Sequence, residues 1–297
     1  MADFGARGFR TDQPAARAVL EEHARNFLHG FNLAAARWAQ PHEELRERIP
    51  DEERGFAYEG AGMFAGIVDL LTAGRARAVR GLLAGPGDQY VHLVNVGAGW
   101  LFTPARVHAV PRLPEGPLLR WLALDGSGFG QVYFGGPRAL RRLAAARPGP
   151  RWEARLAGSG RALWFAESGH PDGIAEVIGR LAPAAHPHVW SGVGLAVTYA
   201  GAAADDALDR LTALARPHQD HFAQGVLFGA AARHRSGIVP ADTRRAATRF
   251  LDLSVEEAAR WCASTAADLS TSTDLRAYLR WKHRLREKAA ERRLQER

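Results

Sequence analysis

The chain has almost no cysteine, lysine or methionine. Its 297 residues include one cysteine, Cys262, and two methionines. A single cysteine excludes an intramolecular disulfide and suits a protein of the reducing cytosol. The basic residues are nearly all arginine, since Lys282 and Lys288 are the two lysines. No apolar run has the length of a signal peptide or of a membrane span, so we expect a soluble, cytoplasmic protein.

The excess of positive charge is concentrated at the C-terminal end. The net charge is +7, and residues 276–297 hold nine Lys/Arg and three Glu, a balance of +6. The remaining residues therefore carry +7 − 6 = +1. A nearly neutral body excludes a protein that coats nucleic acid. With 46% hydrophobic and 24% charged residues, the composition is that of an ordinary globular protein.

Motifs for cofactors, metals and nucleophilic catalysis are also missing. A G-x-G-x-x-A stretch at 60–65 lacks the apolar strand that must precede a dinucleotide site. Ser127 lacks the flanking glycines of a nucleophile elbow. His218 and His221 share a helical turn, but no third ligand lies nearby in the sequence. We therefore expect no metal and no cofactor, and we interpret Cys262 as a core thiol.

The apolar spacing is helical through most of the chain. Apolar residues three and four apart predict helices at 43–49, 173–181, 205–214 and 242–251. Ser254 has the position of a helix N-cap. Glycine pairs four residues apart predict helices that pack closely, and we expect Gly62, Gly192 and Gly229 each to face another helix. Strand-like alternation is confined to 90–96 and 162–165, so we predict an all-α fold.

Two segments resemble each other at an offset of 132 residues. Residues 58–63 and 190–195 share an aromatic–x–Gly–x–Gly pattern, and the same offset carries Gly97 onto Gly229. We predict two pseudo-symmetric helical repeats in one globular unit, with the same helices in 44–96 and 176–228. The alternative is compositional bias in an Ala- and Gly-rich chain. The predicted segments are 1–23, repeat 1 at 24–143, a Pro/Gly/Arg-rich connection at 144–160, repeat 2 at 161–272, and a basic helix at 273–297.

Several segments in order carry a family resemblance: 54–60, 94–100, 118–126, 128–129, 131, 133–134, 163–165, 190–195, 223–225 and 254–259. With these segments the chain resembles an actinobacterial family that occurs with enediyne antibiotic biosynthesis and carries a domain-of-unknown-function label. The resemblance runs from about Gly8 to Arg260 and implies a role in making or maturing the polyketide-derived polyene or enediyne core. It also implies aromatic or titratable residues at the positions of Ser127 and Gly130 and His at that of Asn95, and this chain lacks all three.

Polar residues at positions where a helical core is apolar mark a candidate site. We assign proton transfer to Glu59, His92 and Asp125, because burial raises the pKa of a carboxyl group and makes it a general acid or base. We expect these three to share one cavity with Gln131, Tyr58 and Trp100. The alternative is that each polar group hydrogen-bonds a helix end. The residues assigned to ligand contact are Tyr58, Asn95, Trp100, Phe129, Gln131, Tyr133, Trp190, Ser191 and Gln224.

These observations leave two functions open. The first is a cofactor-free enzyme that processes a hydrophobic polyketide intermediate, free or carrier-bound. The second is a non-catalytic helical module that holds the intermediate or docks a carrier protein or synthase. The basic helix predicted from Asp274 onward either frays in solvent beyond about Glu287 or docks an acidic acyl carrier protein. We expect neither nucleic acid nor a membrane as a partner.

Overall fold

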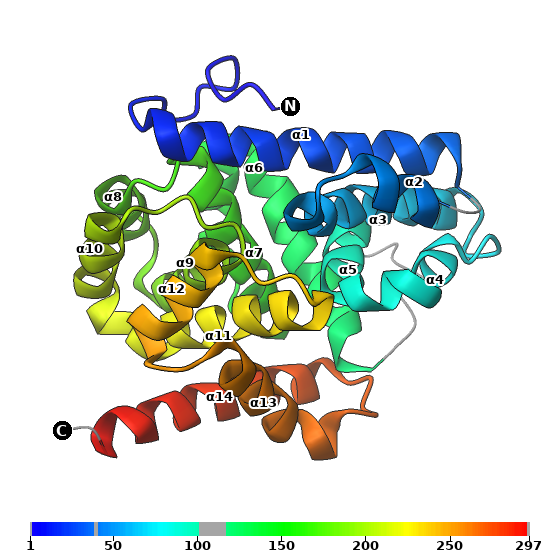
Figure 1. Cartoon of the computed structure of the whole chain (residues 1–297). Helices are drawn as coiled ribbons and strands as arrows, with labels where there is room; N and C mark the ends of the chain where they lie inside the picture. Colours follow the sequence, from blue (N-terminus) through cyan, green and yellow to red (C-terminus); the bar gives the residue numbers. More distant parts are fainter. Residues whose placement is uncertain (1, 39–40, 101–116, 296–297) are drawn as a thin grey trace.

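The chain folds as packed helices. The computed structural model describes residues 2–38, 41–100 and 117–295, and no strand occurs in these ranges, which confirms the all-α prediction (Figure 1). The α-helices are α1 (Pro14–Ala36), α2 (His42–Arg48), α3 (Arg54–Leu71), α4 (Ala78–Leu82), α5 (Val91–Gly99), α6 (Leu122–Ala144), α7 (Pro150–Ala166), α8 (Pro171–Gly179), α9 (His186–Tyr199), α10 (Asp205–Ala215), α11 (Gln219–Ser236), α12 (Ala241–Leu251), α13 (Val255–Ala266) and α14 (Leu275–Gln295).

The helices predicted from local signals at 43–49, 173–181, 205–214 and 242–251 are confirmed, whereas three other segments differ from their prediction. Ser254 caps α13, since its Oγ accepts from the Glu257 amide while the Glu257 carboxylate accepts from the Ser254 amide. The strand candidates 90–96 and 162–165 lie in helical segments. A helix that is buried on most sides has no polar face, so its sequence lacks the periodicity that identifies a helix. The connection predicted at 144–160 links helices only at 145–149, since α7 begins at Pro150.

Seven helices pack in series through paired glycines. The order is α1, α3, α5, α6, α7, α9 and α11, and each helix contacts the next. At the α6–α7 crossing, a carbonyl oxygen of the facing helix fills the space that a Cβ at Gly128 or Gly158 would need. A glycine from each helix makes the same contact at all six crossings. Only glycine lets two helix backbones approach this closely, so these crossings define where each helix can sit.

The series of helices closes on itself. His23 Nε2 of α1 lies 2.9 Å from the carbonyl oxygen of Ala200, just after α9. Arg233 of α11 donates to the carbonyl of Glu52 before α3 and to the carbonyl of Tyr199 in α9. The rings of Phe56 and Tyr199 meet edge to face at 5.5 Å. Residues at the start of the series, in α1 and at the N-terminal end of α3, therefore contact residues at its end, in and after α9 and in α11.

The offset of 132 residues has a structural counterpart. Segment 42–99 contains, in order, α2, a 3₁₀ turn, α3, α4, a 3₁₀ turn and α5, and segment 171–236 has the same order from α8 to α11. Gly60 and Gly192 mark corresponding crossings, and 192 − 60 = 132. From the α1–α3 crossing at Gly60 to the α7–α9 crossing at Gly192, the series advances by four helix-to-helix steps. The offset therefore spans several repeats of one shorter packing pattern. Descent of the two halves from a duplication stays a prediction.

At the crossing of α9 with α11, the offset of 132 misses the equivalent glycine by one helical turn. Gly97 lies against the backbone of Glu59 and Met63, and Gly225 lies against the equivalent Ser191 and Leu195. Gly97 therefore corresponds in space to Gly225 and not to Gly229. The three glycines expected at helix contacts, 62, 192 and 229, all lie within contact distance of another helix.

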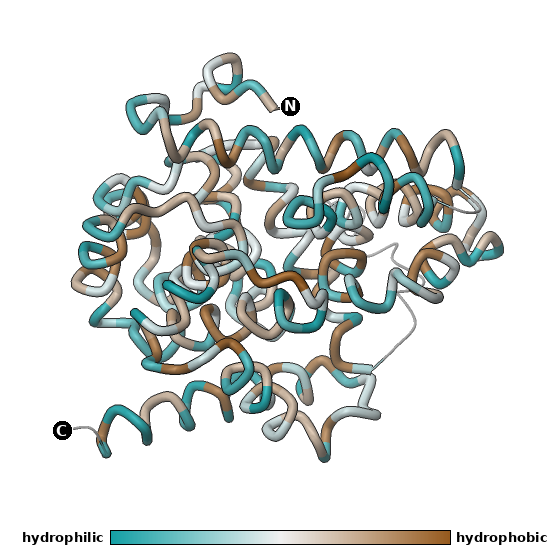
Figure 2. Tube along the Cα trace, in the orientation of Figure 1, coloured by the Kyte–Doolittle hydropathy of each residue, from teal (hydrophilic) through white to brown (hydrophobic). Residues whose placement is uncertain are grey.

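The C-terminal helices cover one side of the series. In Figure 1, α13 and α14 run along the side opposite to α1. Trp281 and Leu285 of α14 are buried, and the helix is mixed teal and brown in Figure 2, as an amphipathic helix is. Among the described helices, none combines the length and the apolar character that crossing a membrane requires.

Candidate functional site

A buried ion cluster joins three of the central helices. Arg161 of α7 contacts Asp125 of α6 at 2.5 Å through Nη1 and Glu59 of α3 at 3.3 Å through Nη2. All three side chains are at most 8% exposed. Trp100 Nε1 donates to Glu59 Oε1 at 3.0 Å. The cluster therefore brings together Glu59, Asp125 and Trp100, which the sequence placed at one site.

Burial and mutual attraction set the protonation of this cluster. Burial raises the pKa of Glu59, against the lowering effect of Arg161. Burial lowers the pKa of Arg161, but the charges of Asp125 and Glu59 outweigh it and raise that pKa above its ordinary value. Arg161 therefore stays charged beside the two carboxyl groups, and the cluster carries no excess positive charge.

Aromatic rings pack around the ion cluster. Trp100 stacks on Phe27 at 4.4 Å and lies 4.6 Å from Phe129, measured between ring centroids. The Arg161 guanidinium lies 5.0 Å from the centroid of the Phe129 ring. Tyr133 stacks on Phe129 at 5.3 Å, and burial raises its pKa to about 12. Trp100, Phe129 and Tyr133 thus form one aromatic group beside the cluster.

A large cavity opens beside α5, α11 and α13. We call it the outer chamber; its volume is about 900 Å3, within the range of small-molecule sites. Two polar groups in its wall have unpartnered buried atoms, namely His92 Nδ1 and Asn95 Oδ1. Cys262 also lines the chamber, and burial raises the pKa of its thiol. Its apolar wall includes Leu83, Val91, Leu118, Phe228, Ala259 and Trp281.

A smaller cavity lies among the central helices. We call it the inner chamber; its free volume is about 40 Å3. It shares His92, Leu122 and Phe228 with the outer chamber, so these side chains stand between the two. Arg161 and Tyr199 contribute the other polar groups of its wall. His92 is thus the assigned proton-transfer residue that lines both chambers, whereas Glu59 and Asp125 lie behind Arg161.

The other predicted site residues lie in separate groups. Tyr58 stacks on Tyr90 at 4.2 Å, and its hydroxyl lies 3.0 Å from His42 Nδ1 in a second, smaller core. Gln131 accepts a hydrogen bond from Arg155. Of the six residues expected around one cavity, His92 lines both chambers, Glu59, Asp125 and Trp100 meet at Arg161, and Tyr58 and Gln131 contact other partners.

The remaining polar pair joins α9 to α11. Ser191 Oγ donates to Gln224 Oε1 at 3.0 Å, and both residues are buried. Trp190 meets Phe222 edge to face at 6.2 Å. Neither pair lines the outer or the inner chamber, so these residues hold two helices together. The interpretation of such polar groups as structural hydrogen-bond partners fits Ser191 and Gln224.

Two residues of the site had no clear signal in the sequence. Arg161 follows a Gly-Ser-Gly stretch and has no acidic residue within one helical turn, so it resembles a surface arginine. Tyr199 ends α9, and its hydroxyl is buried without a hydrogen-bond partner among the described residues. The signal that was present is the uninterrupted apolar surrounding of Arg161, at 162–165.

Histidines of α9 and α11 form a cluster beneath α14. His188 and His221 lie with ring centroids 5.5 Å apart, and His186 and His218 form a similar pair at 5.8 Å. Burial, with the charges of Lys282 and Arg286, lowers the pKa of His188 to about 3, and the pKa of His221 is also about 3. No group of metal ligands occurs in the described ranges. The imidazoles of His188 and His221 are therefore neutral at pH 7.

This cluster predicts a loss of stability in mild acid. The unfolded chain takes up protons at a histidine pKa of about 6.5, whereas the folded chain resists them until about pH 3. The unfolded state binds more protons in that interval, so the free energy of unfolding should fall as pH falls from about 6.5. Thermal melting against pH should show a shallower fall for His221→Phe than for the wild type. His283→Phe, on the exposed side of α14, is the control; an equally steep fall in both variants would contradict the assignment.

The basic C-terminal helix is docked on the fold. The predicted helix from Asp274 is confirmed as α14, which continues past Glu287 to Gln295. Arg284 pairs with Asp268, Arg292 with Asp252 and Arg293 with Asp220. These pairs fix the helix and use much of the charge that was expected to be free. Arg297 lies outside the described residues.

The comparisons with known proteins identify a family and nothing closer. The family model described as protein of unknown function (DUF1702) matches residues 1–289, so the chain belongs to this family. No curated protein matches the chain, and no solved structure matches it. The family label agrees with the domain-of-unknown-function label that the sequence resemblance implied.

Proposed function

We propose that this DUF1702 protein binds a hydrophobic polyene or enediyne-core intermediate of polyketide-derived natural-product biosynthesis. The observation that carries the proposal is the outer chamber, with its mainly apolar wall and the unpartnered atoms of His92 and Asn95. A ligand that is apolar along its length, with few polar groups, matches such a wall. The enediyne context comes from the sequence resemblance. The reducing cytosol that we propose as its location suits the buried thiol of Cys262.

The arrangement of charges favours binding over catalysis. Arg161 holds both Glu59 and Asp125, and it is Arg161 that faces the inner chamber. The assigned acids therefore lack direct access to a ligand in either chamber. His92 has access, and burial lowers its pKa to about 4, which leaves a neutral and weakly basic imidazole at pH 7. We propose that the protein holds its ligand, and that His92 is the residue to test for proton transfer.

A fluorescent polyene tests the proposal. Parinaryl alcohol, a linear conjugated tetraene, should bind with increased fluorescence because the chamber excludes water. Ala263→Trp places an indole at the chamber wall and should weaken binding at least tenfold. The matched control is Ser264→Trp, the next residue of α13, which does not line the chamber. No binding to the wild type, or equal binding to both variants, would overturn the proposal.

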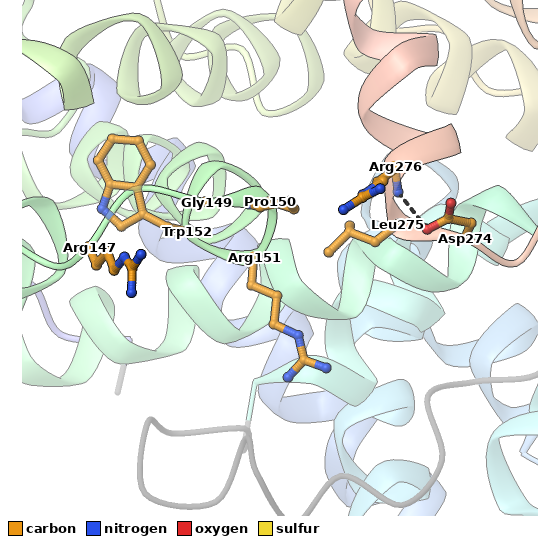
Figure 3. Close-up of a pocket in the computed structure, with 8 residues that line it drawn as sticks. All are labelled: Arg147, Gly149, Pro150, Arg151, Trp152, Asp274, Leu275 and Arg276. Carbon is orange, nitrogen blue, oxygen red and sulfur yellow. Dashed lines mark hydrogen bonds between the residues drawn. The ribbon is translucent and has the colours of Figure 1, made fainter.

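A second candidate function is docking of an acidic carrier protein. A groove of about 440 Å3 is lined by Arg147 and Arg151 on the α6–α7 side and by Arg276 on the α14 side (Figure 3). All three arginines are exposed, and none has an ion-pair partner within the described ranges. Asp274 also lines the groove, where its carboxylate accepts from the Arg276 amide at 2.9 Å. Arginines without an ion-pair partner are more available to an acidic protein surface than the paired arginines of α14 are, so this groove is the better candidate for docking.

Charge reversal tests whether a carrier protein docks at this groove or along the basic helix α14. Replacing Arg147 and Arg151 by Glu should abolish salt-sensitive binding of a purified acyl carrier protein at low ionic strength. Arg284→Gln, which removes an arginine already paired with Asp268, is the control and should bind as the wild type does. Equal binding by the charge-reversed and control variants would contradict docking at this groove.

A further inference from the structure

The inner chamber adjoins the outer chamber on the side toward the central helices. The two share His92, Leu122 and Phe228, and the inner one is walled by residues of α3, α5, α6, α7, α9 and α11. Its free volume of about 40 Å3 exceeds what a single water needs, and it is too small for a chain. A ligand in the outer chamber therefore has room to place only a small end group there.

Two residues that line the inner chamber have buried polar atoms without a hydrogen-bond partner among the described residues. The Tyr199 hydroxyl and His92 Nδ1 are both buried without a hydrogen bond among the described residues. Tyr199 is held by Arg233, which donates to its carbonyl and lies 4.1 Å from its ring centroid. The hydroxyl packs against Gly55, where a Cβ would collide with it. An unpaired buried hydroxyl is costly, so a fixed one of this kind points to a partner that arrives with a ligand.

The charged groups around the inner chamber restrict which ligand end group can bind there. Arg161 lines the wall, but its guanidinium is already bound to Asp125 and Glu59, and together these groups carry no excess positive charge. A carboxylate end group would lose its hydration without gaining a counter-charge. A hydroxyl or carbonyl oxygen loses less hydration and gains the Tyr199 proton, since burial raises the pKa of Tyr199 to about 12 and keeps it protonated.

We infer that the inner chamber binds a neutral oxygen-bearing end group, a hydroxyl or a carbonyl, of an elongated apolar ligand, through Tyr199 and His92. This inference rests on the proposed function, because it concerns the end of the same ligand. It assigns Tyr199 and His92 to ligand selection and leaves Arg161, Glu59 and Asp125 as the support of the chamber wall. A bound water that only completes the hydrogen bonds of Tyr199 and His92 is the alternative occupant.

Three polyenes that differ only at one end test the inference. Parinaryl alcohol, parinaric acid and the corresponding hydrocarbon are titrated against the intact protein by fluorescence at pH 7.5. The wild type should bind the alcohol about five- to tenfold more tightly than the hydrocarbon, as one net hydrogen bond allows. It should bind the carboxylate more weakly than the alcohol. Tyr199→Phe should bind the alcohol and the hydrocarbon alike, with the hydrocarbon affinity unchanged.

The variants distinguish a loss of ligand preference from a loss of stability. Tyr199→Phe removes an unpartnered hydroxyl, so its thermal melting should match or exceed that of the wild type. Tyr58→Phe, whose hydroxyl contacts His42 in the second core, is the control and should keep the preference for the alcohol. Equal affinities of the alcohol and the hydrocarbon in the wild type, or tightest binding of the carboxylate, would overturn the inference alone. Failure of all three probes to bind would overturn the proposed function and this inference with it.

Discussion

Replacing Arg161 by methionine should destabilise the protein by about 3–5 kcal/mol, the usual cost of removing one partner of a buried ion pair. Methionine keeps much of the side-chain volume but leaves Glu59 and Asp125 buried without their counter-charge. Chemical denaturation at pH 7 measures the loss. The loss should become smaller as pH falls, because protonated carboxyl groups no longer need the guanidinium.

A matched arginine on the same helix controls this result. Arg155 of α7 is partly buried and contacts the neutral side chain of Gln131, so Arg155→Met should cost much less. Combining Arg161→Met with Glu59→Gln and Asp125→Asn should recover part of the stability, since no buried charge then lacks a partner. Equal losses in Arg161→Met and Arg155→Met would show that the ion cluster does not stabilise the helices around it.

Adding a single methyl group at Gly192 should also be strongly destabilising. The Ala157 carbonyl oxygen and the Gly160 Cα occupy the space that the new Cβ would need, and neither belongs to a flexible side chain. Gly192→Ala therefore forces α7 and α9 apart at their crossing, at a cost of about 1–3 kcal/mol or more. Thermal melting of the variant against the wild type measures the effect.

Gly179 supplies the control for helix propensity. It ends α8, has open space around its Cα, and has no positive φ. Gly179→Ala should be neutral or stabilising by up to about 1 kcal/mol, because alanine restricts the unfolded chain. If Gly192→Ala melts at the temperature of Gly179→Ala, the close crossing of α7 and α9 is not present in solution.

Local rules were sufficient for the helices and for part of the site. The spacing of apolar residues, the Ser254 cap and the glycine pairs act within one or two turns, so a sequence displays them directly. Glu59 and Asp125 stood out because acidic residues in apolar helical stretches are uncommon. Their meeting at one arginine depends on the order in which α3, α6 and α7 pack, and that order is a property of the whole fold.

The errors in the sequence-based predictions also arise because burial and helix packing depend on the whole fold. Residues 162–165 read as a strand because α7 is buried on most of its surface, which removes the polar face that identifies a helix. Tyr58 was grouped with Glu59 by sequence proximity, but adjacent residues on a helix point in directions about 100° apart. The six glycine crossings explain why one offset of 132 was visible: aligned helices several steps apart share the same small residues.

A crystal structure of the protein with parinaryl alcohol tests the central claim most directly. The tetraene should lie in the outer chamber, along the wall that includes Phe228 and Trp281, with its oxygen in the inner chamber beside Tyr199 and His92. Glu59, Asp125 and Arg161 should keep the contacts that they make without ligand. A tetraene bound on the outer surface, with both chambers filled by protein side chains, would contradict the account.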